Sequence, residues 1–202
     1  MADKLRWGIL STGNIAKQFA RGLAVIDDAE LVAVGSRSQA SADTFGDEFN
    51  VPTRHASYEA LAADPNVDAI YIGTPHPFHK ENALLCIDNG KAVLLEKPFT
   101  INAKDTKAVI DAARAKGVFL MEAMWMRFIP VIERTLALLA EGAIGEPRLL
   151  QADFGFKPAY DPQSRLFNPD LGGGALLDIG IYPLTLACLL FGEPTAIEGL
   201  AT

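Results

Sequence analysis

The sequence has few of the residues that build metal sites and disulfide frameworks. Its 202 residues include only two cysteines and three histidines. Cys86 and Cys188 are far apart, match no metal or redox spacing and lie in apolar helical patterns, so we expect buried free thiols in a reducing, cytoplasmic compartment. His76 and His79 have a metal-like spacing, but Pro77 lies between them and no third ligand is near in the sequence, so we expect no metal.

Long hydrophobic runs and an excess of positive charge are also missing. The longest uninterrupted apolar runs are four to six residues, which is too short to cross a bilayer. The first residues lack the basic and then apolar pattern of a signal peptide. The formal net charge is −7 at pH 7, which disfavours general nucleic-acid binding. We therefore expect small-molecule partners, and neither a membrane nor nucleic acid.

The first part of the chain, to residue 122, alternates short β-type runs with amphipathic helical patterns. This alternation is typical of βαβ units and a parallel sheet. The predicted fold class is therefore α/β, with a Rossmann-type domain over residues 1–122. The expected strands are 5–10, 31–34, a short one near 53, 69–72, 92–95 and 118–121. Gly90 and Gly117 are expected to end helices, and Asn102 to cap one.

Residues 123–202 differ in character and predict the first part of an α+β domain. We expect a helix over 128–141, an antiparallel strand over 148–156 and an apolar helix over 175–190. A single strand has no partner with which to form a sheet, and so few elements enclose too small a core. This domain is therefore expected to be incomplete: either the chain is truncated or the missing strands come from elsewhere.

A glycine turn follows the first strand, at the position of the dinucleotide-binding fingerprint. Residues 11–16 read S-T-G-N-I-A. Ser11 therefore replaces the first glycine of G-x-G-x-x-G/A, and Gly13 is the second glycine. The second glycine lets the backbone approach a pyrophosphate, and the helix N-terminus attracts the anion. An ordinary glycine turn is the alternative. The expected cofactor contacts in this turn are Ser11, Gly13, Asn14 and Ile15.

The second strand ends in G-S-R-S, where an acidic residue normally binds the ribose 2′-hydroxyl of NAD. The guanidinium fork of Arg37 suits the 2′-phosphate of NADP instead, with Ser36 and Ser38 adding hydrogen bonds. A solvated surface arginine is the alternative. NADP is therefore favoured over NAD.

Glu96-Lys97-Pro98 ends a buried strand, at the edge where open α/β sheets bind their ligands. A lysine there is partly desolvated, so its pKa can shift and it can serve in proton transfer. From these three residues alone, an ordinary Lys-Pro surface turn is the alternative.

These motifs together resemble the glucose-fructose oxidoreductase and inositol dehydrogenase (GFO/IDH/MocA) family. The resemblance rests on T-P-H-x-x-H at 74–79, G-K at 90–91, E-K-P at 96–98 and G-G-G-A-L-L-D-I-G-I-Y at 172–182. Tyrosine replaces the histidine of the last motif. This variant, with E-A-M-W-M-R-F at 122–128, is most similar to the dihydrodiol dehydrogenase and NADP-dependent D-xylose dehydrogenase branch.

The resemblance implies an oxidoreductase that transfers a hydride between NADP(H) and a hydroxyl carbon of a sugar or cyclic diol. It makes Lys97 the catalytic lysine, with a cis bond to Pro98, and places Tyr182 and Asp178 on one helix face. Either Tyr182, assisted by the lysine, or Lys97 itself accepts the proton, and Asp178 orients the substrate hydroxyl or the lysine. Family members are longer and usually pair through a large C-terminal sheet, so the full-length protein is expected to be a homo-oligomer.

Further candidate site residues lie in these motifs or are aromatic and basic side chains of the second domain. The expected cofactor contacts beyond the second strand are Thr74, Pro75, His76, His79, Glu96 and Lys97. The expected substrate contacts are Trp125, Arg127, Phe128, Phe156 and Asp178. Packing at a domain interface is the alternative for Trp125 and Phe128. For Arg127 the alternative is contact with an acidic neighbour such as Glu122, and for Phe156 it is packing against missing partners. The competing functions are a non-catalytic NADP-binding regulator, in which the catalytic pair would be degraded, and an inactive fragment of the enzyme.

Overall fold

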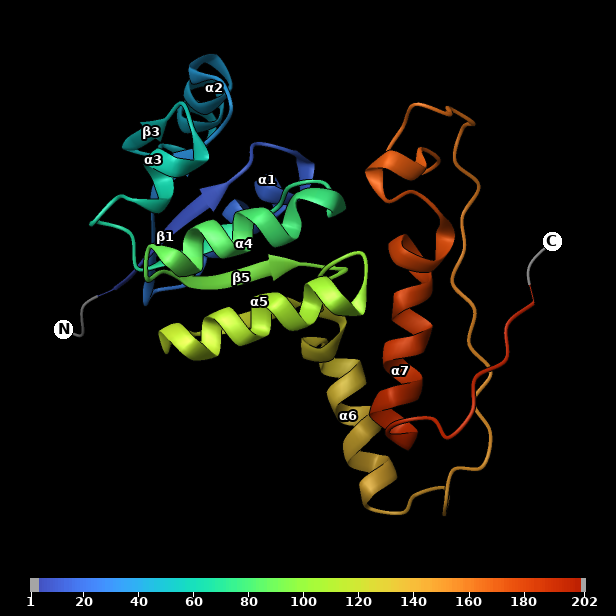
Figure 1. Cartoon of the computed structure of the whole chain (residues 1–202). Coiled ribbons are helices and arrows are strands. Elements are labelled where there is room, and N and C mark those ends of the chain that lie inside the picture. Colours follow the sequence, from blue (N-terminus) through green and yellow to red (C-terminus); the bar gives the residue numbers. More distant parts are fainter. Residues whose placement is uncertain (1–3, 201–202) are drawn as a thin grey trace. The chain divides into compact units, whose positions relative to one another are not determined.

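The computed structural model describes residues 4–200 and divides into two compact units, Met1–Ala123 and Met124–Thr202 (Figure 1). The division falls next to the domain boundary drawn from the sequence. The first unit contains a sheet covered by helices. The second contains helices joined by a long irregular segment.

The first unit is the parallel α/β sheet that the sequence predicts. Its strands are β1 (Leu5–Leu10), β2 (Ala29–Gly35), β3 (Thr53–His55), β4 (Ala69–Ile72), β5 (Ala92–Glu96) and β6 (Leu120–Ala123). Their order is β3-β2-β1-β4-β5-β6, and the neighbouring strands are parallel. The strand order reverses between β1 and β4, and open α/β sheets bind ligands outside the carboxyl ends of the strands at such a point.

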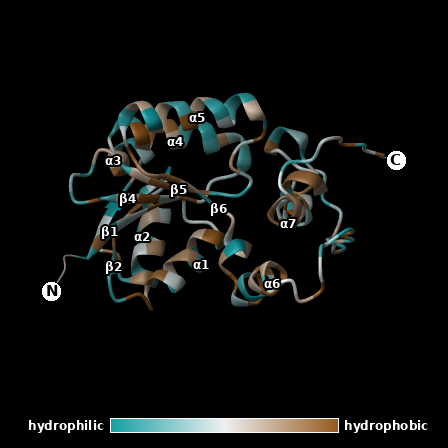
Figure 2. Ribbon diagram, turned by 90° about the horizontal axis from the view of Figure 1, so that it is seen from below, coloured by the Kyte–Doolittle hydropathy of each residue, from teal (hydrophilic) through white to brown (hydrophobic). Residues whose placement is uncertain are grey.

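Helices cover both faces of this sheet (Figure 2). One face carries α1 (Asn14–Leu23) and α2 (Gln39–Phe49), and the other carries α4 (His79–Asp88) and α5 (Ala103–Lys116). The short α3 (Tyr58–Ala62) joins β3 to β4, and a 3-10 turn, η1 (His76–Phe78), precedes α4. Asn102 caps α5 by accepting the N–H of Asp105, and Gly117 ends it at a φ of 67°, as predicted.

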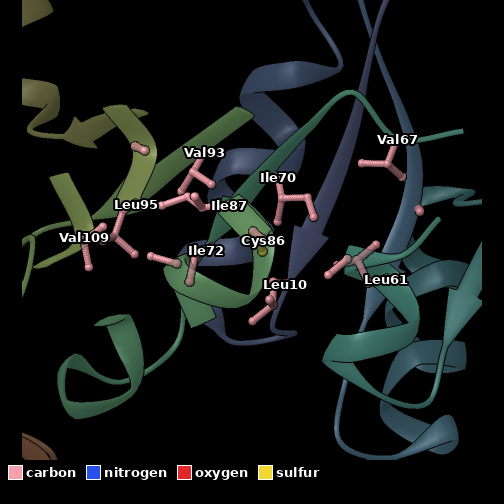
Figure 3. Close-up of a cluster of buried hydrophobic side chains, with 14 residues drawn as sticks. Leu10, Leu61, Val67, Ile70, Ile72, Cys86, Ile87, Val93, Leu95 and Val109 are labelled. Atoms are coloured by element: carbon pink, nitrogen blue, oxygen red, sulfur yellow. The ribbon is translucent and has the colours of Figure 1, made fainter. Parts of the chain in front are cut away.

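The core consists of two apolar clusters, one on each side of the sheet. Figure 3 shows the cluster beneath α4 and α5, to which β4 contributes Ile70 and Ile72. Tyr71, between them, belongs to the cluster beneath α1 and α2. Successive residues of a strand point to opposite faces. Because helices cover both faces, every residue of β4 is buried.

The second unit contains the two predicted helical regions but not the predicted strand. Its elements are η2 (Trp125–Phe128), α6 (Pro130–Ala140), η3 (Pro169–Leu171), the π-helical turn η4 (Leu176–Gly180) and α7 (Ile181–Phe191). Residues 148–156 form no strand, so that prediction is wrong. An alternating pattern forms a strand only where a second strand completes its hydrogen bonds. The described residues of this unit include no strand that could pair with this segment.

Two expectations about apolar segments also fail in this unit. Cys188 is exposed, whereas Cys86 is buried as expected. α7, which carries Cys188, has no buried residue among those described. The helical stretch Pro169–Phe191 is long and apolar enough to cross a membrane, by length and composition only. The length of uninterrupted apolar runs did not predict this, because polar residues interrupt the stretch. A helix that packs inside a protein domain has the same composition, so this match alone assigns no location.

Candidate cofactor and catalytic site

The turn between β1 and α1 presents backbone at a helix N-terminus, with a constrained residue at its start. Ser11 has a φ of 113°, in the left-handed region that favours glycine. Its hydroxyl accepts the N–H of Gly13 at 3.2 Å. Gly13, Asn14 and Ile15 are exposed. The serine therefore adopts a backbone conformation that favours glycine, and the start of α1 is accessible to an anion.

Ser11→Gly is expected to raise the free energy of unfolding by about 1 kcal/mol, because glycine adopts this φ without strain. Urea denaturation of the purified variants measures the effect. Ser11→Ala is the control, since it keeps the Cβ and removes only the hydroxyl. A glycine variant no more stable than the alanine variant would rule out strain at this position.

The residues after β2 differ in exposure and in their hydrogen-bond partners. Ser36 is buried, and its N–H donates to the carbonyl oxygen of His55. The hydroxyl of Ser38 caps α2 by accepting the N–H of Ser41 at 3.3 Å, so the helix uses the group expected to bind cofactor. Arg37 is exposed. It lies beside Tyr58, whose pKa is raised by burial against the opposing influence of the guanidinium.

A cavity of about 310 Å³ opens between the glycine turn and α2. Its lining residues are Thr12, Lys17, Ala40, Ser41, Thr44 and Phe45. The ammonium of Lys17 lies 2.5 Å from Oε2 of Glu48. Hydroxyl groups and a lysine at this place, next to the turn and to the start of α2, suit a phosphate-bearing part of a ligand.

The loop after β4 is tied to the turn after β5 by His79. Thr74 and His76 are buried and Pro75 is exposed. His79 is fully buried, with Nε2 at 2.8 Å from the carbonyl oxygen of Thr74 and Nδ1 at 2.8 Å from that of Pro98. Burial lowers the pKa of His79, although the carbonyl contacts oppose this. The ring of His79 therefore joins two loops, and its expected contact with the cofactor stays a prediction.

The E-K-P turn is held by a buried carboxylate, Glu96, on one side and by a half-buried one, Glu122, on the other. The Lys97-Pro98 bond is cis, as the resemblance implies. Glu96 is buried, and it accepts the hydroxyl of Tyr71 at 2.5 Å and the N–H of Lys97 at 3.1 Å. Beyond the proline, the N–H of Phe99 donates to Oε1 of Glu122 at 2.8 Å. Glu96 therefore supports the turn, and its expected contact with the cofactor stays a prediction.

In the second unit, Tyr182 lies among aromatic side chains. The indole N–H of Trp125 donates to the Tyr182 hydroxyl oxygen at 3.0 Å. The ring centroid of Tyr182 lies 5.5 Å from that of Trp125 and 5.4 Å from that of Phe154, and both pairs are edge to face. These contacts fix the phenol oxygen and the plane of its ring.

Asp178 lies in the π-helical turn before α7, and such turns are frequent at functional sites. It is buried, and its Oδ1 accepts a hydrogen bond from Arg165 at 2.8 Å. Arg165 was missed in the sequence because it lies in an irregular segment without periodicity. The other expected substrate residues, Arg127, Phe128 and Phe156, are exposed. Among residues 4–200, no three His, Cys, Asp or Glu side chains are grouped as a metal site.

Comparison with known families decides the assignment of the whole chain. The family model described as an oxidoreductase family with an NAD-binding Rossmann fold matches residues 5–124. A second model, the GFO/IDH/MocA C-terminal domain, matches residues 132–202. The chain belongs to the GFO/IDH/MocA oxidoreductase family. This is the family that the motifs resemble.

Within the GFO/IDH/MocA family, the curated relatives support the dihydrodiol dehydrogenase branch. Trans-1,2-dihydrobenzene-1,2-diol dehydrogenase of Mus musculus is 45% identical over 190 residues, which make up 93% of this chain and 56% of that enzyme. The enzyme of the same name from Xenopus laevis is 44% identical over 188 residues, or 92% and 56% of the two chains. The chain thus spans just over half the length of these relatives.

Solved structures of the family share the fold. A 3-ketoreductase from Actinomadura kijaniata, in complex with NADP and TDP-benzene, has a TM-score of 0.86 and 33% identity over 94% of this chain and 58% of that one. An aldose-aldose oxidoreductase from Caulobacter crescentus, complexed with glycerol, has a TM-score of 0.87 and 31% identity over the same shares.

Proposed function

We propose that the full-length protein is an NADP-dependent dehydrogenase that transfers a hydride between the cofactor and a hydroxyl carbon of a cyclic diol or sugar. The observation that carries this proposal is the turn of Lys97 at the carboxyl end of β5. Its backbone is hydrogen-bonded to the side chains of Glu96, His79 and Glu122. A turn held by these three hydrogen bonds suits a lysine whose position matters for chemistry.

The proposed cofactor residues are consistent with a dinucleotide. The exposed backbone at Gly13 suits a pyrophosphate. Exposed Arg37, which precedes the α2 residues that line the cavity, suits a 2′-phosphate. Thr74, Pro75 and His76 follow β4 on the switch-point side of the sheet, as in other nucleotide-binding α/β folds. When bound, the nicotinamide supplies the carbon that accepts or gives the hydride.

Lys97, Tyr182 and Asp178 are the residues we propose for proton transfer. A secondary hydroxyl must lose a proton as its carbon loses a hydride, so a base is required. Tyr182 accepts this proton with the lysine as a neighbouring cation, or Lys97 accepts it directly. Asp178 orients the substrate hydroxyl or the lysine. The indole donor on the Tyr182 oxygen supports a fixed phenol in this role.

The proposal predicts oxidation of trans-dihydrodiols or aldoses with a kcat/KM for NADP at least about tenfold above that for NAD, a margin that one good charge-assisted contact supplies. Absorbance at 340 nm during a substrate panel measures the rates. Faster turnover with NAD would refute the cofactor assignment. NADPH binding without turnover of any substrate would favour the non-catalytic regulator.

A further inference from the structure

A tyrosine and a glutamate on neighbouring strands form a buried pair behind the E-K-P turn. The register sets Tyr71 of β4 opposite Leu94 of β5, and Glu96 follows two residues later. Side chains two apart on a strand share a face, so Tyr71 and Glu96 are diagonal neighbours beneath α1 and α2. Tyr71 is 1% exposed and Glu96 8% exposed. The phenol donates to Glu96 Oε1 at 2.5 Å.

Packing explains the ring of Tyr71 but not its hydroxyl. The ring stacks on Phe19 of α1, with centroids 4.0 Å apart and planes 5° from parallel. Phenylalanine would make the same stack without burying a polar group, whose burial costs free energy unless it is hydrogen-bonded. The partner of the hydroxyl is Glu96. The second oxygen of that carboxylate accepts the N–H of Lys97.

We infer that Tyr71 is a positioning residue that keeps the Glu96 carboxylate ionised and oriented, and through it fixes the backbone of Lys97. The inference rests on the proposed function, because it assumes that Lys97 is catalytic. The other side of the turn provides a contrast. There Glu122 accepts the N–H of Phe99, so a second carboxylate gives the same kind of backbone support.

The charges around Glu96 determine how the pair responds to pH. Burial raises the pKa of Glu96, while the hydrogen bonds from Tyr71 and from the Lys97 N–H, and the Lys97 charge, lower it. The negative charge of Glu122 on β6 raises it. Loss of the Tyr71 hydroxyl removes a lowering contribution, so Glu96 takes up its proton at a higher pH. A protonated carboxyl is a weaker acceptor for the Lys97 N–H.

Tyr71→Phe tests the inference because it keeps the ring and removes only the hydroxyl. We expect the pKa of Glu96 to rise by about one unit, the scale of a lost hydrogen bond to a charged group. Carbon-13 NMR of labelled glutamate carboxyls measures it, with Glu96→Gln identifying the signal. The acid limb of kcat should move upward with it, while the KM for NADP stays within about twofold. Phe19→Leu is the control, because it removes the stack but leaves the hydroxyl.

The outcomes separate this inference from the proposed function. An unchanged Glu96 titration in Tyr71→Phe would overturn the inference, and so would a shifted titration with an unchanged acid limb. Wild-type protein that turns over no substrate would count against the proposed function, while the carboxyl titration would still report on the pair. Should Tyr71→Phe not fold, Glu96→Gln replaces it: we expect the acid limb of kcat to differ from that of the wild type because the contribution of Glu96 is lost, and an unchanged acid limb would overturn the inference.

Discussion

Lys97→Met should lower kcat by a factor of about a thousand while leaving the Kd for NADPH within about threefold of the wild-type value, because positioned acid–base groups typically contribute 10²–10⁴-fold. Methionine keeps the length and apolar stem of the side chain but has no ammonium group. The turn itself should persist, since its hydrogen bonds come from Glu96, His79 and Glu122. Stopped-flow turnover and NADPH fluorescence titration measure the two quantities.

A lysine outside the site provides the matched control for that experiment. Lys107 is exposed on α5 and pairs with Asp111 one helical turn later. Lys107→Met therefore makes the same chemical change at the surface, where an exposed pair contributes little, and should leave both kcat and NADPH binding unaltered. Turnover that survives Lys97→Met would refute both versions of the proton-transfer proposal.

Tyr182→Phe then separates the two versions. A comparable loss of kcat in Lys97→Met and Tyr182→Phe would assign proton acceptance to the phenol, assisted by the lysine. A large loss in Lys97→Met alone would assign it to the lysine. The indole N–H of Trp125 donates to the phenol oxygen, so thermal denaturation of Tyr182→Phe should accompany the kinetics. It distinguishes lost chemistry from lost packing.

The parallel sheet was predictable because its signals are local. Apolar runs the length of strands, helices of 3.6-residue period and the caps at Asn102 and Gly117 each depend on a few consecutive residues. The E-K-P and G-G-G motifs were equally readable, since each is contiguous. The family assignment followed from these motifs, and the comparisons confirmed it.

The contacts within the site were harder to predict because they join residues distant in the sequence. Tyr71 and Glu96 are 25 residues apart and meet only because β4 and β5 are neighbours in a specific register. A phenol inside the apolar run 69–72 was the available signal, since a buried hydroxyl needs a partner. Arg165 gave no such signal. The strand expected over 148–156 failed for a related reason, since a strand depends on a partner that its own sequence does not specify.

The choice of cofactor depends on Arg37, and here a second large effect is expected. Arg37→Asp should weaken NADPH binding by a factor of about a hundred, since hydrogen bonds to charged groups contribute 1.5–3 kcal/mol and every 1.4 kcal/mol changes Kd tenfold. NADH, which lacks the 2′-phosphate, should lose no affinity, because an acidic residue at this strand end suits a ribose 2′-hydroxyl. Isothermal titration calorimetry with both cofactors measures the two constants.

Two further variants make the Arg37 result specific to the phosphate. Arg37→Lys keeps the charge but loses the planar fork, so its NADPH affinity should lie between those of wild type and Arg37→Asp. Arg114→Asp, an equal charge change at an exposed position of α5, should alter neither constant. An equal loss of NADPH and NADH binding in Arg37→Asp would show that the arginine supports the loop. A loss confined to NADPH would show that it binds the 2′-phosphate, because that group is the only difference between the two ligands.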